Sequence, residues 1–182
     1  MTKYLFILII IAFTKLHGGV FDFDGNVVTI TNHQGDLLPT QLGSKYYDIT
    51  SYFEKHGYVY MPVDDADVMY KTVGSYSEEI EPLSVDDEKG YNRVNGYRYS
   101  YGYFYNESPK LEKIAKKYFD SIYVFHKDEL TRRYGKPKKK KDYLIFTART
   151  DSTRYFEIIL GKYRHRIGVI LKFTVDLKKY GY

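Results

Sequence analysis

Tyrosine occupies every second position of one stretch of the chain, from residue 97 to residue 105. Residues two apart on a β-strand point to the same side, so this period of two predicts a strand that gathers five phenols on one face. Two interpretations stay open: the face packs against a helix as part of the core, or it is a stacking surface for sugars or bases. The five residues are Tyr97, Tyr99, Tyr101, Tyr103 and Tyr105.

A helix is predicted directly after this strand, at about residues 109–125. Ser108 supplies an N-cap, Pro109 suits the first helical position, and apolar residues then recur at helical spacing. The helix either continues or restarts through residues 128–134, where Gly135 and Pro137 are stop signals. This is the principal amphipathic helix of the chain, and it is available to cover the tyrosine face.

Shorter patterns precede the tyrosine strand. The pair Asp24-Gly25 stands between two alternating runs and predicts a hairpin across residues 20–30. Residues 74–90 combine Gly, Ser, Pro and acidic residues without periodicity, which predicts an exposed acidic loop. Residues 31–44 are polar and rich in turn formers, which predicts another loop. Strand patterns lie at residues 46–53, 58–61 and 68–73.

The last third of the chain completes the predicted fold. Three strand patterns, at residues 143–149, 154–160 and 167–177, predict an antiparallel meander. With 22 Tyr and 11 Phe in the chain, strands are expected to outnumber helices, because aromatic residues favour pleated surfaces. The predicted fold class is α+β: an antiparallel tyrosine-rich sheet, one principal helix and a C-terminal β-meander.

The N-terminus has the pattern of a secretory signal peptide. Lys3 precedes an apolar run at residues 4–13, and Gly18 and Gly19 follow a polar break. A bilayer span needs about 20 apolar residues, so an uncleaved signal anchor is the weaker alternative. We expect residues 1–19 to be the signal peptide and residues 20–182 to form a single secreted domain. The chain has no cysteine, so this domain relies on its core instead of disulfides.

Charge divides the chain into two unlike halves. Residues 19–108 contain 15 acidic and 6 basic residues, a net charge of −9, whereas residues 109–182 contain 8 acidic and 20 basic residues, a net charge of +12. The halves either neutralise each other within one compact domain or present a face to an acidic partner.

Seven positive charges fall within ten residues of a basic linker at residues 132–141. Such a run is typical of a patch for polyanions (glycan, nucleic acid or anionic membrane surface) and of a nuclear import signal, and a solvated linker is the alternative. We therefore expect a non-enzymatic interaction protein that binds a protein or a polyanion, and whose export allows it to act as an effector delivered into another cell. The expected contacts are Arg132, Arg133, Lys136, Lys138, Lys139, Lys140 and Lys141.

A catalytic alternative comes from the motif Val20-Phe21-Asp22-Phe23-Asp24-Gly25, which resembles the first motif of haloacid-dehalogenase-type phosphatases. The resemblance implies that a strand ends at Asp22 as the nucleophile, that Asp24 is the acid/base, and that magnesium is shared between them. It also implies that Thr147, at the end of a later strand pattern, supplies a phosphate-binding hydroxyl. Asn26 departs from the family pattern, which usually has Thr there.

A third interpretation is a structural secreted protein that self-associates through its tyrosines. Outside the phosphatase alternative, the sequence predicts no metal site and no cofactor. The five His residues show no spacing of paired metal ligands, and the acidic turn at residues 64–67 lacks the Gly and the distal Glu of a calcium loop.

Overall fold

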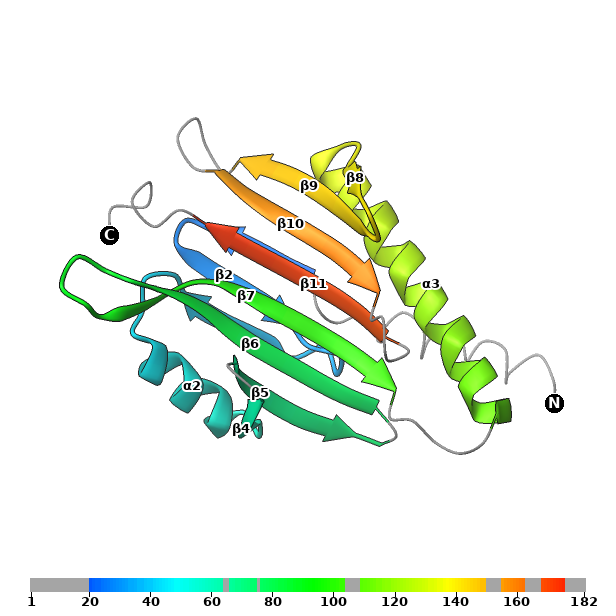
Figure 1. Ribbon diagram of the computed structural model, residues 1–182, viewed down its shortest axis with the longest axis horizontal. Coiled ribbons are helices and arrows are strands. Elements are labelled where there is room, and N and C mark those ends of the chain that lie inside the picture. The colour runs from blue at the N-terminus through cyan, green and yellow to red at the C-terminus, as the bar shows by residue number, and fades with distance from the viewer. Residues whose placement is uncertain are drawn as a thin grey trace.

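The structure is a computed structural model that describes residues 20–63, 66–74, 76–103, 109–149, 155–162 and 168–175. Within these residues, two helices and eleven strands follow one another along the chain (Figure 1). The helices are α2 (Tyr46–Lys55) and α3 (Pro109–Tyr134).

The strands form two antiparallel sheets. The smaller sheet has the order β1-β2-β3 and consists of β1 (Val20–Asp24), β2 (Val27–Thr31) and β3 (Leu37–Gln41). The larger sheet has eight strands in the order β4-β5-β6-β7-β11-β10-β9-β8. Its strands are β4 (Val59–Val63), β5 (Ala66–Val73), β6 (Tyr76–Asp86), β7 (Asn92–Tyr103), β8 (Lys138–Lys140), β9 (Tyr143–Arg149), β10 (Tyr155–Lys162) and β11 (Gly168–Val175).

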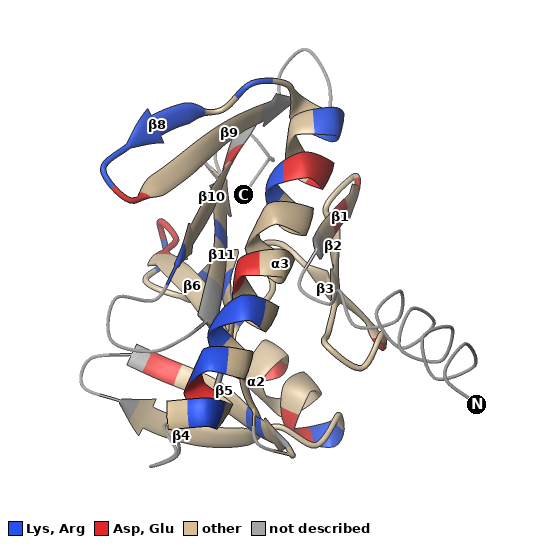
Figure 2. Ribbon diagram, turned by 90° about the vertical axis from the view of Figure 1, so that its right-hand side faces the viewer, with Lys and Arg blue, Asp and Glu red and all other residues tan. Residues whose placement is uncertain are grey.

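Among the described residues, the helices and the small sheet cover the large sheet on one side. Seen from the side in Figure 2, the large sheet forms one layer, and α2, α3 and the small sheet form the second. Helix α3 packs on β9, β10 and β11, while α2 packs on β4 to β7. The opposite face carries no helix or strand of the described chain, and along β11 half-buried side chains alternate with buried ones.

The core lies between these two layers and is built mainly from aromatic rings. Phe173 of β11 is its centre: the ring of Phe21 lies 4.7 Å away, that of Phe23 5.1 Å and that of Tyr97 5.7 Å. Phe119 of α3 packs 5.2 Å from Tyr101. The small sheet and the long helix are therefore anchored to the same strands, β7 and β11, by apolar burial.

The α+β fold class, the antiparallel tyrosine-rich sheet and the C-terminal meander are confirmed. The predicted strand at residues 143–149 matches β9, and β9, β10 and β11 are consecutive neighbours in antiparallel register. The principal helix continues to Tyr134, well beyond residue 125, and Gly135 ends it with a φ of 80°. The hairpin at residues 20–30 also forms, with its turn at Gly25 and Asn26.

Three local predictions are wrong. Residues 46–53, predicted as a strand, lie in helix α2, whose buried residues Ile49, Thr50 and Phe53 follow helical spacing. The predicted loop at residues 31–44 contains strand β3, whose pattern of alternating burial fixes its register on β2. The predicted acidic loop at residues 74–90 contains β6, an eleven-residue strand in the large sheet. The predicted signal peptide, residues 1–19, lies outside the described residues.

Candidate functional site

The basic segment at residues 132–141 is not a linker, because it belongs to three elements of the fold. Arg132 and Arg133 form the end of α3, Lys138–Lys140 is the strand β8, and Lys141 begins the turn into β9. Strand β8 is the last strand of the large sheet, and among the described strands it pairs with β9 alone. Its three exposed lysines therefore line a free sheet edge, coloured blue in Figure 2.

Pairing with β9 sends the lysines of β8 to both faces of the sheet. Lys138 is paired with Ile145 and Lys140 with Tyr143, while Lys139 between them is paired with Leu144. Opposite residues of a β-ladder share a face, so Lys138 and Lys140 lie on the open face and Lys139 lies on the face that α3 covers. A ligand at this edge is met by ammonium groups from both sides.

The two arginines of the predicted patch are already engaged. Arg132 donates to Glu129 at 2.7 Å, and Arg133 donates to Glu129 at 2.6 Å and to Asp22 at 2.5 Å. Hydrogen bonds from Arg132 and Arg133 lower the pKa of the Glu129 carboxyl to about 2. These arginines therefore act mainly within the fold, where Arg133 ties the end of α3 to β1.

The lysines behave differently from the arginines. Five exposed lysines in residues 136–141 form no ion pair with any described residue. Their charges are held within a short span by the end of α3, by Pro137 and by pairing to β9. We refer to these five residues as the lysine edge: Lys136, Lys138, Lys139, Lys140 and Lys141.

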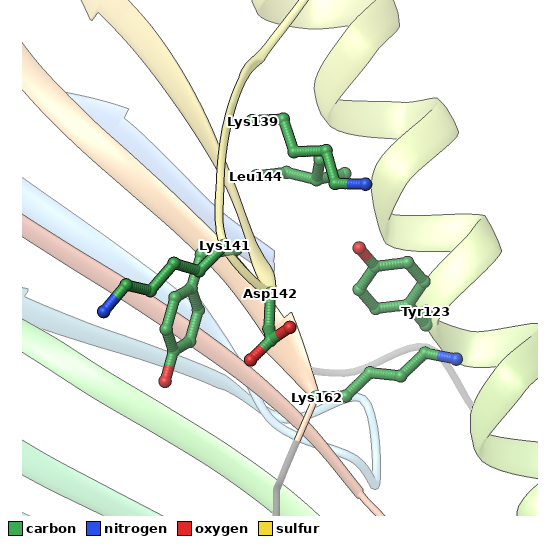
Figure 3. A pocket seen from close by; sticks show the side chains of 7 residues that line it. Tyr123, Lys139, Lys141, Asp142, Leu144 and Lys162 are labelled. Atoms are coloured by element: carbon green, nitrogen blue, oxygen red, sulfur yellow. The ribbon is translucent and has the colours of Figure 1, made fainter.

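A pocket of about 380 Å³ adjoins the lysine edge (Figure 3). It lies where the turn between β8 and β9 and the end of β10 face the middle of α3. Tyr123 projects from α3 toward the sheet, and the carboxylate of Asp142 lies opposite it. The lining residues are Tyr123, Lys139, Lys141, Asp142, Tyr143, Leu144 and Lys162.

One lysine of this pocket has its charge matched inside the fold. The Nζ atom of Lys162 donates to Asp120 at 2.6 Å and lies 4.9 Å from the centre of the Tyr123 ring. Burial raises the pKa of the Tyr123 hydroxyl, so Tyr123 is a neutral phenol at physiological pH. The lining of the pocket therefore combines Tyr123, the carboxylate of Asp142 and the paired Lys162. It also includes Lys139 and Lys141, which form no ion pair with a described residue.

The tyrosine face is part of the core. Tyr97, Tyr99 and Tyr101 are at most 3% exposed, and each points toward the second layer. The interpretation of these three residues as a stacking surface for a ligand is therefore wrong. The alternative interpretation, that they pack in the core, is confirmed. The side chain of Tyr103 and the whole of Tyr105 lie outside what the structure describes.

A buried polar cluster lies beneath the tyrosines, and the sequence did not predict it. The Oε1 atom of Glu78 accepts hydrogen bonds from the Tyr99 hydroxyl at 2.7 Å and from the His33 backbone N–H at 3.0 Å. The Tyr101 hydroxyl lies 2.7 Å from Nε2 of His33. Burial raises the pKa of the Glu78 carboxyl, although the hydrogen bond from Tyr99 opposes the shift. The cluster connects the turn after β2 to the large sheet. In the sequence, the burial of Glu78 is indicated only by its position two residues before Ile80, which places both side chains on the same face of β6.

The residues of the phosphatase alternative are not gathered into one site. The resemblance implies a strand that ends at Asp22, whereas β1 continues to Asp24 and turns back into β2. Asp22 is exposed and accepts a hydrogen bond from Arg133. Thr147 lies in β9 of the other sheet, opposite Glu157. Within the described chain, no three His, Asp or Glu side chains are grouped to hold a metal ion.

Comparison of the chain with protein-family models, with curated proteins and with solved structures gives no match. Function has to be inferred from the arrangement of the residues themselves. Of the helices that the structure describes, none has the length and the apolar character needed to cross a membrane.

Proposed function

We propose that this protein binds a polyanionic partner through the lysine edge. The observation that supports the proposal is the contrast between the two kinds of cation in one short segment: the arginines are paired within the fold, and the five lysines are not. An unpaired charge gains from binding a polyanion because condensed counterions are released from the partner. A paired charge would first have to lose its partner.

The second support is the position of these lysines on the sheet. An edge strand exposes unpaired backbone groups, and lysines on it also prevent edge-to-edge association with other sheets. Three consecutive lysines on β8 fulfil this protective role, yet Lys136 and Lys141 lie outside the strand and add nothing to it. The concentration of charge beyond the strand favours binding. Export by a signal peptide at residues 1–19, with action outside the cell or inside another cell, remains part of the proposal.

Heparin affinity chromatography tests the proposal with a matched pair of variants. The first variant replaces the five lysines of the lysine edge with Gln. The control replaces five exposed lysines of α3 with Gln, which gives the same change in net charge at another place: Lys110, Lys113, Lys116, Lys117 and Lys127. Gln and Lys have similar helix propensities, so α3 is preserved in the control.

The lysine-edge variant is expected to elute from heparin at much lower salt than the unmodified protein, and the control is expected to elute close to it. Equal losses in the two variants would show that net charge alone governs binding, which would contradict a localised site. Retention of the lysine-edge variant at the original salt concentration would refute the proposal directly.

A second candidate function, self-association, is favoured by the other edge of the large sheet. Of the strands that the structure describes, β4 pairs with β5 alone, and it exposes Val59, Tyr60 and Met61, which are 65%, 43% and 38% accessible. An apolar edge strand is a template for pairing with another chain. Size-exclusion chromatography over a series of concentrations tests this candidate: a shift toward larger species that Val59→Lys abolishes supports it, and a constant monomer contradicts it.

A further inference from the structure

We infer that the polyanion is an anionic membrane surface, which the protein meets with the lysine edge and with the exposed side of α3 at the same time. This inference rests on the proposed function and adds the class of partner to it. Clusters of about four to eight Lys or Arg residues, on a helix or close to a membrane, are typical of proteins that bind anionic lipid head groups. The lysine edge is one such cluster, and α3 supplies a second one beside it.

The lysines of α3 share the property that distinguishes the lysine edge. Five exposed lysines of this helix form no ion pair with any described residue: Lys110, Lys113, Lys116, Lys117 and Lys127. Figure 2 looks onto α3 and shows basic positions along it in blue, as on β8. Residues 109–142 together contain 12 basic and 5 acidic residues, a net charge of +7. The two elements therefore form one basic region of the surface.

The two groups of lysines meet at the pocket beside α3. Lys139 extends from β8 toward the helix, and Tyr123 projects from the helix toward the sheet (Figure 3). Lys127 lies four residues after Tyr123 and Lys116 lies seven residues before it, so both share its side of α3. At a rise of about 1.5 Å per residue, they lie about 6 Å and about 10 Å from Tyr123 along the helix axis. Unpaired lysines therefore border the pocket on both α3 and β8.

This arrangement favours a planar partner over a linear one. Strand β8 has three residues and is about 10 Å long, so a thin chain that follows it meets lysines over a short distance. Four of the five lysines of α3 lie about 9–20 Å from Tyr123 along the helix axis, beyond the Debye length of about 8 Å at physiological salt. A chain bound along β8 is screened from most of these charges. A surface that covers the pocket and the helix meets lysines of both elements at once.

The outer side of α3 also offers an apolar contact that suits a bilayer. Val124 is 52% exposed, and Lys117 and Lys127 lie seven residues before it and three residues after it, on the same side of the helix. Helices that lie on an anionic bilayer combine such residues, because the apolar side chain enters the boundary of head groups and acyl chains while lysines stay at the level of the phosphates. The contact is peripheral, with α3 lying along the surface.

Sedimentation with vesicles tests the inference. The two probes are vesicles of phosphatidylcholine alone and mixed vesicles of phosphatidylcholine and phosphatidylserine in equal amounts. The unmodified protein is expected to bind the mixed vesicles and to be released by added salt, because the attraction is electrostatic. It is not expected to bind the vesicles of phosphatidylcholine, which carry no net charge.

The two Gln variants of the heparin experiment distinguish a surface from a chain. On mixed vesicles, the lysine-edge variant and the α3 variant are each expected to lose at least about 25-fold in affinity. Each lysine near an anionic surface contributes about fivefold, and at least two lysines of each group make contact. On heparin, only the lysine-edge variant is expected to lose affinity. Circular dichroism reports whether both variants fold.

A gain of binding separates the effect of charge from that of misfolding. Glu112 and Asp128 are exposed on α3 and form no ion pair with a described residue. Glu112→Gln and Asp128→Asn each remove a negative charge, and each is expected to raise the affinity for mixed vesicles by about fivefold. The matched control is Asp86→Asn at the end of β6, in the hairpin that lies across the molecule from α3 in Figure 1. It is expected to leave this affinity within about twofold.

The outcomes distinguish the inference from the proposed function. Absence of binding to mixed vesicles, with heparin binding retained, would overturn the inference, leave the proposed function intact and identify a linear polyanion as the partner. An α3 variant that keeps the full affinity for mixed vesicles would also overturn the inference, because the contact would not include the helix. Failure of the protein to bind both heparin and mixed vesicles would overturn the proposed function itself.

Discussion

Replacing Glu78 tests whether the buried polar cluster holds the two layers together. Glu78 is 0% exposed, and its Oε1 atom accepts from Tyr99 and from the backbone N–H of His33. Tyr99 belongs to the large sheet, whereas His33 lies in the turn that follows β2. Glu78→Ala removes the acceptor for both donors, and Glu78→Gln retains an oxygen at the same place while removing the ionisable group.

The expected magnitude follows from the two buried donors. Each buried donor left without an acceptor costs about 1–3 kcal/mol, so the two lost hydrogen bonds of Glu78→Ala should lower the free energy of unfolding by about 2–6 kcal/mol. This is a large part of the total for a domain of this size, which is typically about 5–15 kcal/mol. Glu78→Gln should lose far less at any pH, because its amide oxygen still accepts from Tyr99 and His33.

The pH dependence has a definite sign. Burial raises the pKa of Glu78 above its ordinary value of 4.5, so the folded state holds this proton more tightly than the unfolded state does. The contribution of Glu78 to stability is therefore fully present below pH 4.5, and it declines as the pH rises toward the raised pKa of the folded protein. Glu78→Gln has no such decline, so its stability relative to the unmodified protein should improve across this window.

Urea unfolding followed by tyrosine fluorescence and circular dichroism, at pH values from 4 to 8, measures both effects. The chain has no Trp, so the fluorescence reports on tyrosine alone. Taking the difference between the unmodified protein and the Gln variant at each pH removes the contributions of the other titrating groups. A difference that stays constant with pH, or equal losses for Ala and Gln, would refute the assignment of Glu78 as a buried acceptor with a raised pKa.

Three further substitutions probe the packing of the layers, each measured by urea unfolding. Phe173→Ala should lower the free energy of unfolding by about 3–5 kcal/mol, because rings from both layers meet this side chain, and a loss below 1 kcal/mol would contradict its central position. Gly96→Ala should lower the free energy of unfolding by about 1–3 kcal/mol, because its Cβ would lie 2.9 Å from the Cα atom of Thr174. An unchanged unfolding transition would show that β7 and β11 are spaced more widely. Asp22→Asn should lower the free energy of unfolding by only about 0–1 kcal/mol, because the ion pair of Asp22 with Arg133 is exposed. A phosphatase assay on the same variant tests the catalytic alternative, which requires an activity that Asp22→Asn abolishes.

The parts of the fold that sequence predicted correctly are those in which periodicity agrees with composition. Strand β9, the first hairpin and the start of α3 combine the right period with turn or cap residues at their ends. Helix α2 was missed because Tyr46, Ile49 and Thr50 have strand-like propensity. Their spacing together with Phe53 is helical, and burial of this face decided the conformation.

Strand β6 was missed because it is rich in Glu and contains Pro82, both of which are depleted in strands. The structure shows why the proline is tolerated. The pairing of β6 with β5 ends at Ile80, so Pro82 is paired on one side only, with Tyr97 of β7. Glu78 is tolerated because Tyr99 and His33 satisfy its Oε1 atom from elements distant in sequence, a relation that no local pattern reports.

The candidate site shows the same distinction between local pattern and distant contact. The density of lysine at residues 136–141 was evident from the sequence, but the division of the basic segment into paired arginines and unpaired lysines was not. That division depends on Asp22, which is 111 residues away from Arg133. The pocket likewise depends on α3 bringing Tyr123 close to the turn between β8 and β9.

The topology also bears on the two unlike halves of the chain. The order β4-β5-β6-β7-β11-β10-β9-β8 places strands of the acidic half on one side of the β7–β11 pair and strands of the basic half on the other. In the ion pairs among the described residues, both partners belong to the same half of the chain, except in the pair of Arg133 with Asp22. Pairwise contacts between the halves therefore neutralise little of the positive charge, and the lysine edge lies at the end of the sheet farthest from β4. Because exposed charges more than a Debye length apart are largely screened at physiological salt, the acidic strands across the sheet do not cancel the attraction of this edge for a polyanion.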